Sequence, residues 1–278
     1  MTNDELIKTA FSYLGKEKVS RIWAWDIFRE DFAQCRASLN GQKPNCEQID
    51  FLSRSTALFL SSWGMYRGSG DLLDGNYRQF DDIIPILLDE KWWEPNPALE
   101  KKKLLFELLK TKIKSDLACQ KIISGVFGCM VPFDNINRKG ISVWAKSDLN
   151  ETGKRHFSLN DPFSENNDRL YSFHDFAQPL MERPEHYPLP GTPRYPKERL
   201  IDIYFFWIGS CVEDLQWLRK HPEIKAGPTK KKFEGLRGFY NNAGNRADLK
   251  ETIRGLLPDE ILKVIDESAR QSKRSKVK

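Results

Sequence analysis

The sequence lacks the residue spacings on which many metal and disulfide sites depend. Its 278 residues include five cysteines and four histidines, but no Cys-x-x-Cys, His-Glu-x-x-His or His-x-x-x-His. Zinc ribbons, cysteine-ligated iron–sulfur clusters and zinc proteases need such spacings, so we expect no metal and no cofactor. An odd, scattered set of cysteines is not typical of a disulfide framework, and it fits a reducing cytoplasm.

Motifs of nucleotide and acyl chemistry are missing as well. There is no GxxxxGK[ST] loop, no GxGxxG after a strand, no GxSxG and no HxE…PCxxC. These absences argue against P-loop ATPases, dinucleotide enzymes, α/β-hydrolases and zinc deaminases. No apolar run reaches ~18 residues, and the first residues carry no basic segment followed by an apolar core. We therefore expect a soluble, cytoplasmic protein without a membrane partner.

Positive charge is concentrated at the C-terminal end. Residues 219–278 hold 16 Lys and Arg against 8 Asp and Glu, a net charge of +8, whereas the remainder holds 28 against 31, a net charge of −3. Such an asymmetry favours a polyanionic partner, with nucleic acid the first candidate. The alternative is a solvated basic tail, since the last ~8 residues have the composition of a disordered segment.

Apolar residues recur at helical spacing along most of the chain, and strand signals are sparse. A mainly α fold is expected. Pro85 is expected to kink the fourth helix. The predicted helices span 3–14, 18–36, 49–66, 76–90, 98–110, 113–127, 134–145, 197–219, 246–256 and 259–270.

Three segments carry a resemblance to a known family. They are ALFLSSWGMYRGSGDLL (57–73), SDLACQKIISGVFGCMVPFDNINRKGI (115–141) and YPKERLIDIYFFWIGSC (195–211). In the second, an apolar run from Ala118 to Val126 ends in Phe127–Gly128, and a short linker leads to Asp134. This pattern resembles the core of helix-hairpin-helix DNA glycosylases, in which an aspartate opens the helix after the hairpin. The first and third segments look like the family's early helix and its late aromatic helix.

The resemblance implies a two-lobed helical fold over 1–219 with a long irregular insertion at 146–196. Residues 220–278 would then form a basic C-terminal appendage. The chain departs from the family in three places. LLKTKIKSD (108–116) has no glycine where the family's hairpin has Gly-x-Gly, Asp116 stands where lyase-type members have a lysine, and the cysteine cluster of many relatives is absent. The second departure favours simple base removal over strand cleavage.

Asp134 is the predicted catalytic residue. Breaking an N-glycosidic bond builds positive charge on the sugar, and a carboxylate beside it stabilises that charge or orients a water molecule. Aspartate is equally a favoured helix N-cap, so position alone does not separate the two roles.

The remaining predicted site residues contact a flipped-out base or DNA phosphates. The length of 146–196 and the resemblance to antiviral members of the family favour a bulky, modified base. For each residue the alternative is core packing or a solvated charge. The predicted base pocket comprises Trp63, Tyr66, Arg67, His174, Tyr204 and Trp207, and the predicted DNA contacts are Lys110, Lys112, Lys114, Arg138, Lys139, Lys230, Lys231 and Lys232.

Three other functions fit parts of the sequence. A non-catalytic nucleic-acid-binding protein would keep the basic residues without needing Asp134. A base-modifying transferase on the same fold would need a second, small substrate. A helical scaffold or toxin–antitoxin component would use its basic tail to bind an acidic protein.

Overall fold

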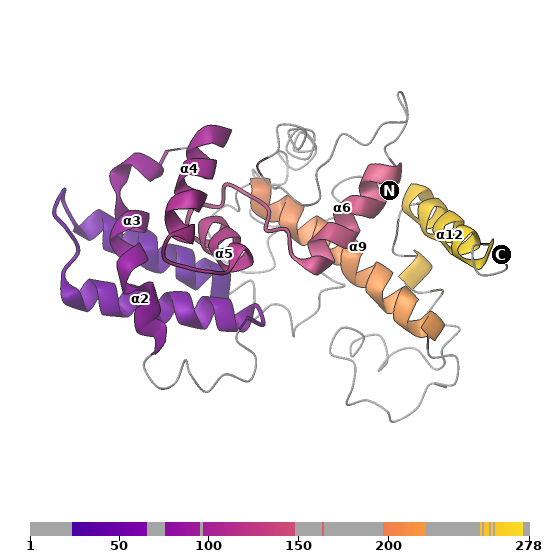
Figure 1. Ribbon diagram of the computed structural model, residues 1–278, viewed down its shortest axis with the longest axis horizontal. Helices are drawn as coiled ribbons and strands as arrows, with labels where there is room; N and C mark the ends of the chain where they lie inside the picture. Colours follow the sequence, from indigo (N-terminus) through magenta and orange to yellow (C-terminus); the bar gives the residue numbers. More distant parts are fainter. Residues whose placement is uncertain are drawn as a thin grey trace. The chain divides into compact units, whose positions relative to one another are not determined.

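The computed structural model describes residues 24–65, 76–94, 97–147, 163, 197–220, 251, 253–255, 257 and 259–274. These residues are mainly helical and contain no strand, as the sequence predicts (Figure 1). The chain divides into two compact units. We call Lys16–Pro132 with Leu170–Arg199 the N-terminal unit, and Met1–Gly15, Phe133–Arg169 and Leu200–Lys278 the C-terminal unit.

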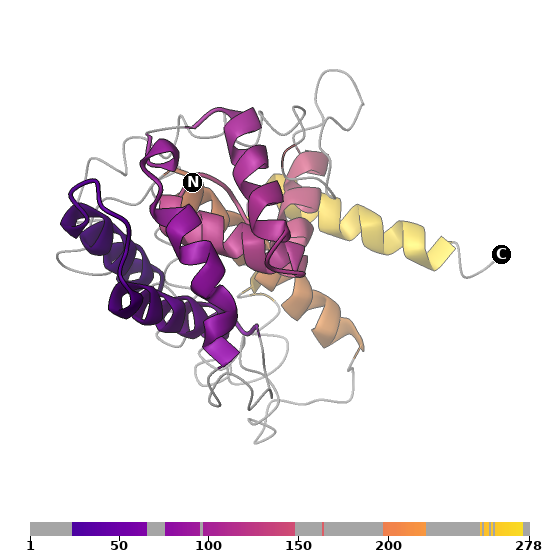
Figure 2. The same ribbon diagram turned by 60° about the vertical axis from the view of Figure 1, so that its left-hand side comes forward.

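The N-terminal unit begins with two helices joined by a short turn. A helix over residues 24–38 lies beside α2 (Cys46–Ser62), and Figures 1 and 2 show the pair from two sides. Asn45 and Gln48 form a reciprocal capping box at the start of α2, each side chain accepting a hydrogen bond of 2.9 Å from the other's backbone N–H. At the other end Gly64 adopts φ 76°, and the N–H of Met65 donates to the carbonyl of Leu60 at 3.1 Å. This Schellman motif ends α2 before residue 66, where the sequence-based helix ended.

The prediction of one continuous helix over 76–90 is wrong, because the segment forms three short helical pieces. The structure has a 3₁₀-helix η2 (Asn76–Ile83), a short helix α3 (Ile84–Leu88) and a 3₁₀ turn η3 (Glu90–Trp92). Pro85 lies in the first turn of α3 rather than at a kink. Proline is tolerated there because the first-turn N–H groups of a helix have no partner within it.

Helices α4 (Leu99–Lys110) and α5 (Asp116–Phe127) form a hairpin close to the predicted bounds. Every residue of α5 from Ala118 to Val126 is buried, so this helix is the centre of the N-terminal unit. Gly125 lets two aromatic rings lie directly on α5. The rings of Phe28 and Phe59 stack 4.3 Å apart, and a methyl group on Gly125 would come within 2.7 Å and 2.9 Å of them, respectively.

The described part of the C-terminal unit is built from α6 (Asn135–Ser147), α9 (Lys197–Lys220, its first turn excepted) and α12 (Asp259–Arg274). In Figures 1 and 2, α6 lies across α9, and α12 packs against α6. The guanidinium of Arg254 binds the carboxylate of Asp266 on α12 through two hydrogen bonds, of 2.7 Å and 3.3 Å. The C-terminal helix thus lies in the same compact unit as α6 and most of α9. The division into a domain over 1–219 and an appendage over 220–278 stays a prediction.

Several predicted segments lie outside the described residues. They include the helix over 3–14, residues 275–278 and almost all of 146–196. Residues 271–274, which belong to the last ~8 residues, are helical. Of that long segment, residues 146 and 147 end α6, and Phe163 is a buried turn residue. In the described part of the chain, no helix is long and apolar enough to cross a membrane.

Candidate functional site

Asp134, the predicted catalytic residue, lies between α5 and α6, directly before the first residue of α6. Helix α5 ends where Gly128 adopts the left-handed conformation, with φ 64°. The linker that follows, from Cys129 to Phe133, is buried throughout. A buried, non-helical linker fixes the path of the chain, so Asp134 reaches α6 in a defined position.

The carboxylate of Asp134 caps α6. Its Oδ1 accepts hydrogen bonds from the backbone N–H groups of Ile136 at 2.9 Å and Asn137 at 2.8 Å, and its carbonyl accepts one from the N–H of Arg138 at 2.9 Å. The predicted capping role is therefore confirmed. The side chain remains half-buried rather than enclosed, and its direction is set by two backbone donors.

Helices α6 and α9 approach each other so closely that only glycine fits at two positions. A methyl group on Gly140 would overlap the backbone oxygen of Phe205, and one on Gly209 would overlap the backbone oxygen of Ile136. Without a side chain at each of these positions the two backbones can touch. Asp134 therefore caps a helix whose place beside α9 is tightly fixed.

Polar pairs reinforce the same helix contact. The Nδ2 of Asn137 donates to Oδ1 of Asp202 at 2.6 Å, and both side chains are fully buried. Nearer the surface, the ammonium of Lys139 lies 2.6 Å from Oε1 of Glu213. Sequence reasoning missed Asn137 and Asp202, although a carboxylate inside the apolar run IDIYFFW signals a buried partner.

The predicted pocket residues on α9 lie in the interior of the C-terminal unit. Tyr204 is 3% exposed and Trp207 is fully buried, and their rings meet edge to face at 5.7 Å. Such burial is what core packing, the alternative to a base pocket, predicts for these two side chains. Their role in a base pocket stays a prediction.

Trp63, at the end of α2 in the N-terminal unit, is half-buried and has an unexpected neighbour. The ammonium of Lys121 lies 4.9 Å from the centre of its ring, and the Lys121 side chain is only 4% exposed. A cation placed over an indole face is stabilised by the ring's electron density, which offsets part of the cost of burying a charge. The other predicted pocket residues, Tyr66, Arg67 and His174, lie outside the described residues.

Three of the predicted DNA contacts, Lys110, Lys112 and Lys114, lie at the end of α4 and in the segment before α5, which we call the α4–α5 turn. Two of these lysines form ion pairs with acidic side chains. The ammonium of Lys110 lies 3.1 Å from Asp116 and that of Lys112 lies 3.2 Å from Asp82. Lys114 is exposed and forms no ion pair with the described part of the chain. A phosphate would meet Lys114 directly but would compete with carboxylates for the other two.

Arg138 differs from its neighbour Lys139, which pairs with Glu213. Arg138 is half-buried on α6, and its Nε is buried with no hydrogen-bond partner among the described residues. It lies one helical turn after Asp134, on the same side of the helix. Of the predicted DNA contacts, Lys230, Lys231 and Lys232 lie outside the described residues.

The cysteines of the described chain are all free thiols, and Cys46 is the exposed one. Burial raises the pKa of Cys119 to about 12, which keeps this thiol protonated and unreactive. Within the described ranges no three His, Cys, Asp or Glu side chains are grouped in a way that could hold a metal ion.

Comparisons of the chain with protein-family models, with curated proteins and with solved structures find no match.

Proposed function

We propose that this protein is a DNA glycosylase that removes a base by hydrolysis and leaves an abasic site. The observation that carries the proposal is Asp134, a half-buried carboxylate at the N-terminus of α6 whose direction is set by two backbone N–H groups. A preorganised negative charge of this kind stabilises positive charge that develops in a transition state. Arg138, one turn further along α6, places a positive charge on the same side of the helix, which suits an anionic substrate.

In the proposed reaction the bond between C1′ of the deoxyribose and the base nitrogen breaks. The base leaves with the bonding electrons and takes up a proton, while water adds to C1′ and loses one. Asp134 stabilises the cationic sugar or orients that water molecule. The base must first leave the helical stack, because its glycosidic bond is shielded inside a duplex. The substrate class that we propose is DNA with a modified base, which follows from the resemblance and from the length of 146–196.

The proposal is tested by counting abasic sites. The purified protein would be incubated with ordinary bacterial DNA and with viral DNA that carries hypermodified cytosine or thymine, and the sites would be labelled with an aldehyde-reactive probe. We expect abasic sites in one of the two DNAs. If neither DNA acquires them although the protein binds both in a salt-sensitive way, base excision is ruled out and a non-catalytic binding protein or a transferase without its second substrate remains.

Lys114 provides a separate test of DNA binding. Replacing this exposed lysine with alanine is expected to weaken binding to any DNA sequence and to reduce the slope of log K against log salt concentration by about 0.9, because one phosphate contact is lost. The matched control is Lys43→Ala, which removes the same charge from an exposed position in the turn before α2. Equal salt slopes for the two variants and the wild type would place the DNA elsewhere than the α4–α5 turn.

A further inference from the structure

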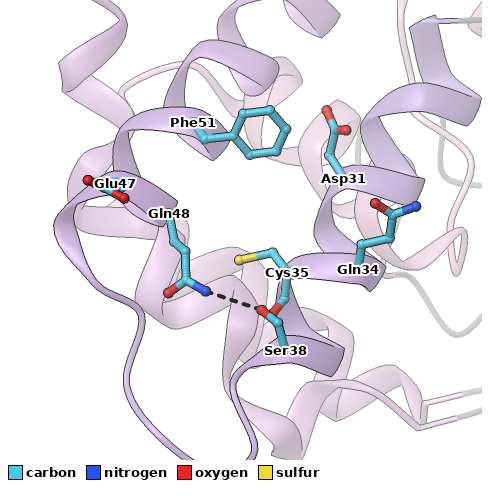
Figure 3. Close-up of a pocket in the computed structure, with 7 residues that line it drawn as sticks. All are labelled: Asp31, Gln34, Cys35, Ser38, Glu47, Gln48 and Phe51. Atoms are coloured by element: carbon cyan, nitrogen blue, oxygen red, sulfur yellow. Dashed lines mark hydrogen bonds between the residues drawn. The ribbon is translucent and has the colours of Figure 1, made fainter.

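A groove with a volume of about 360 Å³ lies between helix 24–38 and α2, close to the turn that joins them (Figure 3). Both helices belong to the N-terminal unit. Seven side chains line the groove; two of them are carboxylates and none is basic. The groove is lined by Asp31, Gln34, Cys35, Ser38, Glu47, Gln48 and Phe51.

Hydrogen-bond donors of the groove are directed at the protein itself. The amide of Gln48 donates to the hydroxyl of Ser38 at 3.2 Å, and that hydroxyl donates to the carbonyl of Cys35 at 2.6 Å. The amide nitrogen of Gln34 donates to Glu30, and Figure 3 shows its oxygen turned towards the groove. What the groove chiefly offers a ligand is therefore negative charge and acceptor oxygens.

Asp31 is a charge that the fold does not neutralise. Its carboxylate accepts a hydrogen bond of 2.5 Å from the hydroxyl of Ser55, and it forms no ion pair with the described residues. Burial raises the pKa of Asp31, the Ser55 hydrogen bond opposes this rise, and the nearby charge of Glu30 adds to it. Folding therefore holds the carboxylate of Asp31 where its charged form is disfavoured, and a bound cation would offset that cost.

Phe51 places an aromatic ring beside Asp31 in the groove. Its side chain is 51% exposed, and in Figure 3 its ring projects over the groove towards Asp31. A cation between an aromatic face and a carboxylate gains from both. A guanidinium suits the pair best, because it is planar enough to stack on the ring while its N–H groups reach the carboxylate oxygens.

Exposed apolar side chains extend this surface along the same two helices. Ile27 is 61% exposed and lies one turn before Asp31, while Leu58 is 71% exposed and lies two turns after Phe51. A free ion would leave them in water. A peptide could cover them while its basic side chain entered the groove, as is usual where aromatic and apolar residues surround a charged anchor.

We propose that this groove binds an arginine side chain presented by a peptide segment of a partner protein, with apolar residues of that segment resting on Ile27 and Leu58. The proposal does not depend on base excision, since it uses no residue of the C-terminal unit.

Fluorescence anisotropy with a labelled octapeptide tests it, the peptide carrying one arginine flanked by leucines. The matched ligand replaces arginine with citrulline, which keeps the shape and removes the charge. We expect the full-length protein to bind the arginine peptide at least ten times more tightly than the citrulline peptide. Free butylguanidinium should displace the peptide only at concentrations at least ten times higher than unlabelled peptide does. Equal affinity for the two peptides, or equal displacement by butylguanidinium, overturns the proposal.

Variants of the protein complete the test. Asp31→Asn and Phe51→Leu should each weaken binding of the arginine peptide at least ten-fold, whereas Glu107→Gln, an exposed charge change on α4, should leave it unchanged. Asp31→Asn should also raise the melting temperature at neutral pH. Because the pKa of Asp31 is raised in the folded state, this gain should vanish as the pH falls through that pKa to below the unfolded value of 3.8. Binding of the arginine peptide that is unaffected by either groove variant contradicts the proposal.

Discussion

Asp134→Asn is expected to slow base release by at least ~100-fold while changing the free energy of unfolding by less than ~0.5 kcal/mol. Asparagine caps helices about as well as aspartate, because its side-chain oxygen can accept the same bonds from Ile136 and Asn137. What asparagine cannot supply is the negative charge beside the sugar. The two quantities would be measured by counting abasic sites over time and by urea unfolding.

The comparison variant is Asp134→Ala, which removes both the charge and the cap. It should lose base release to the same extent and in addition destabilise the protein by about 1 kcal/mol. If Asp134→Asn excises bases at the wild-type rate, Asp134 is a cap and nothing more. A loss of activity in Asp134→Ala alone, in step with its lost stability, would lead to the same conclusion.

Gly209→Ala is expected to destabilise the C-terminal unit by about 3 kcal/mol. The added carbon would overlap the backbone oxygen of Ile136, and a backbone cannot move aside as a flexible side chain can. Alanine favours an isolated helix by about 1 kcal/mol over glycine, so the steric cost has to exceed that gain. The change would be measured by chemical unfolding, followed by circular dichroism.

Gly255→Ala is the matched control for this substitution. Gly255 lies in a helical turn of the same unit, and a methyl group there meets no atom within 4 Å. This variant should be neutral or stabilised by up to about 1 kcal/mol. Wild-type stability for Gly209→Ala, beside such a control, would mean that α6 and α9 do not touch at Gly209.

Apolar spacing located most helices of the described chain closely, and α6 lies within two residues of its predicted limits. The structure places α4, α5 and α9 within three residues of their predicted limits. The start of α2 was set three residues late, although Asn45 and Gln48 spell the capping box in the sequence. The 76–92 region was misjudged because apolar spacing predicts a continuous helix, and spacing alone does not reveal a change from 3₁₀ to α geometry at Pro85.

The candidate site was foreseeable only in part, because most of its features depend on tertiary contacts. Asp134 could be placed at a helix start from the sequence, and its capping bonds confirm that position. The pairing of Lys112 with Asp82 joins residues 30 positions apart and leaves no local signal. Lys121 could not be recognised as buried, since a lysine in an amphipathic helix is normally placed on the solvent side.

Reciprocal glycine contacts also restrict how α6 and α9 can move. Helices in many regulated proteins slide past each other by small steps or by a whole turn. Here a one-turn shift would carry Gly209 away from Ile136 and bring Phe205 or Glu213 to that point, and each of these has a side chain that the spacing does not admit. A one-turn step is therefore blocked in both directions. The C-terminal unit should transmit any movement of α9 to the start of α6 as a rigid body.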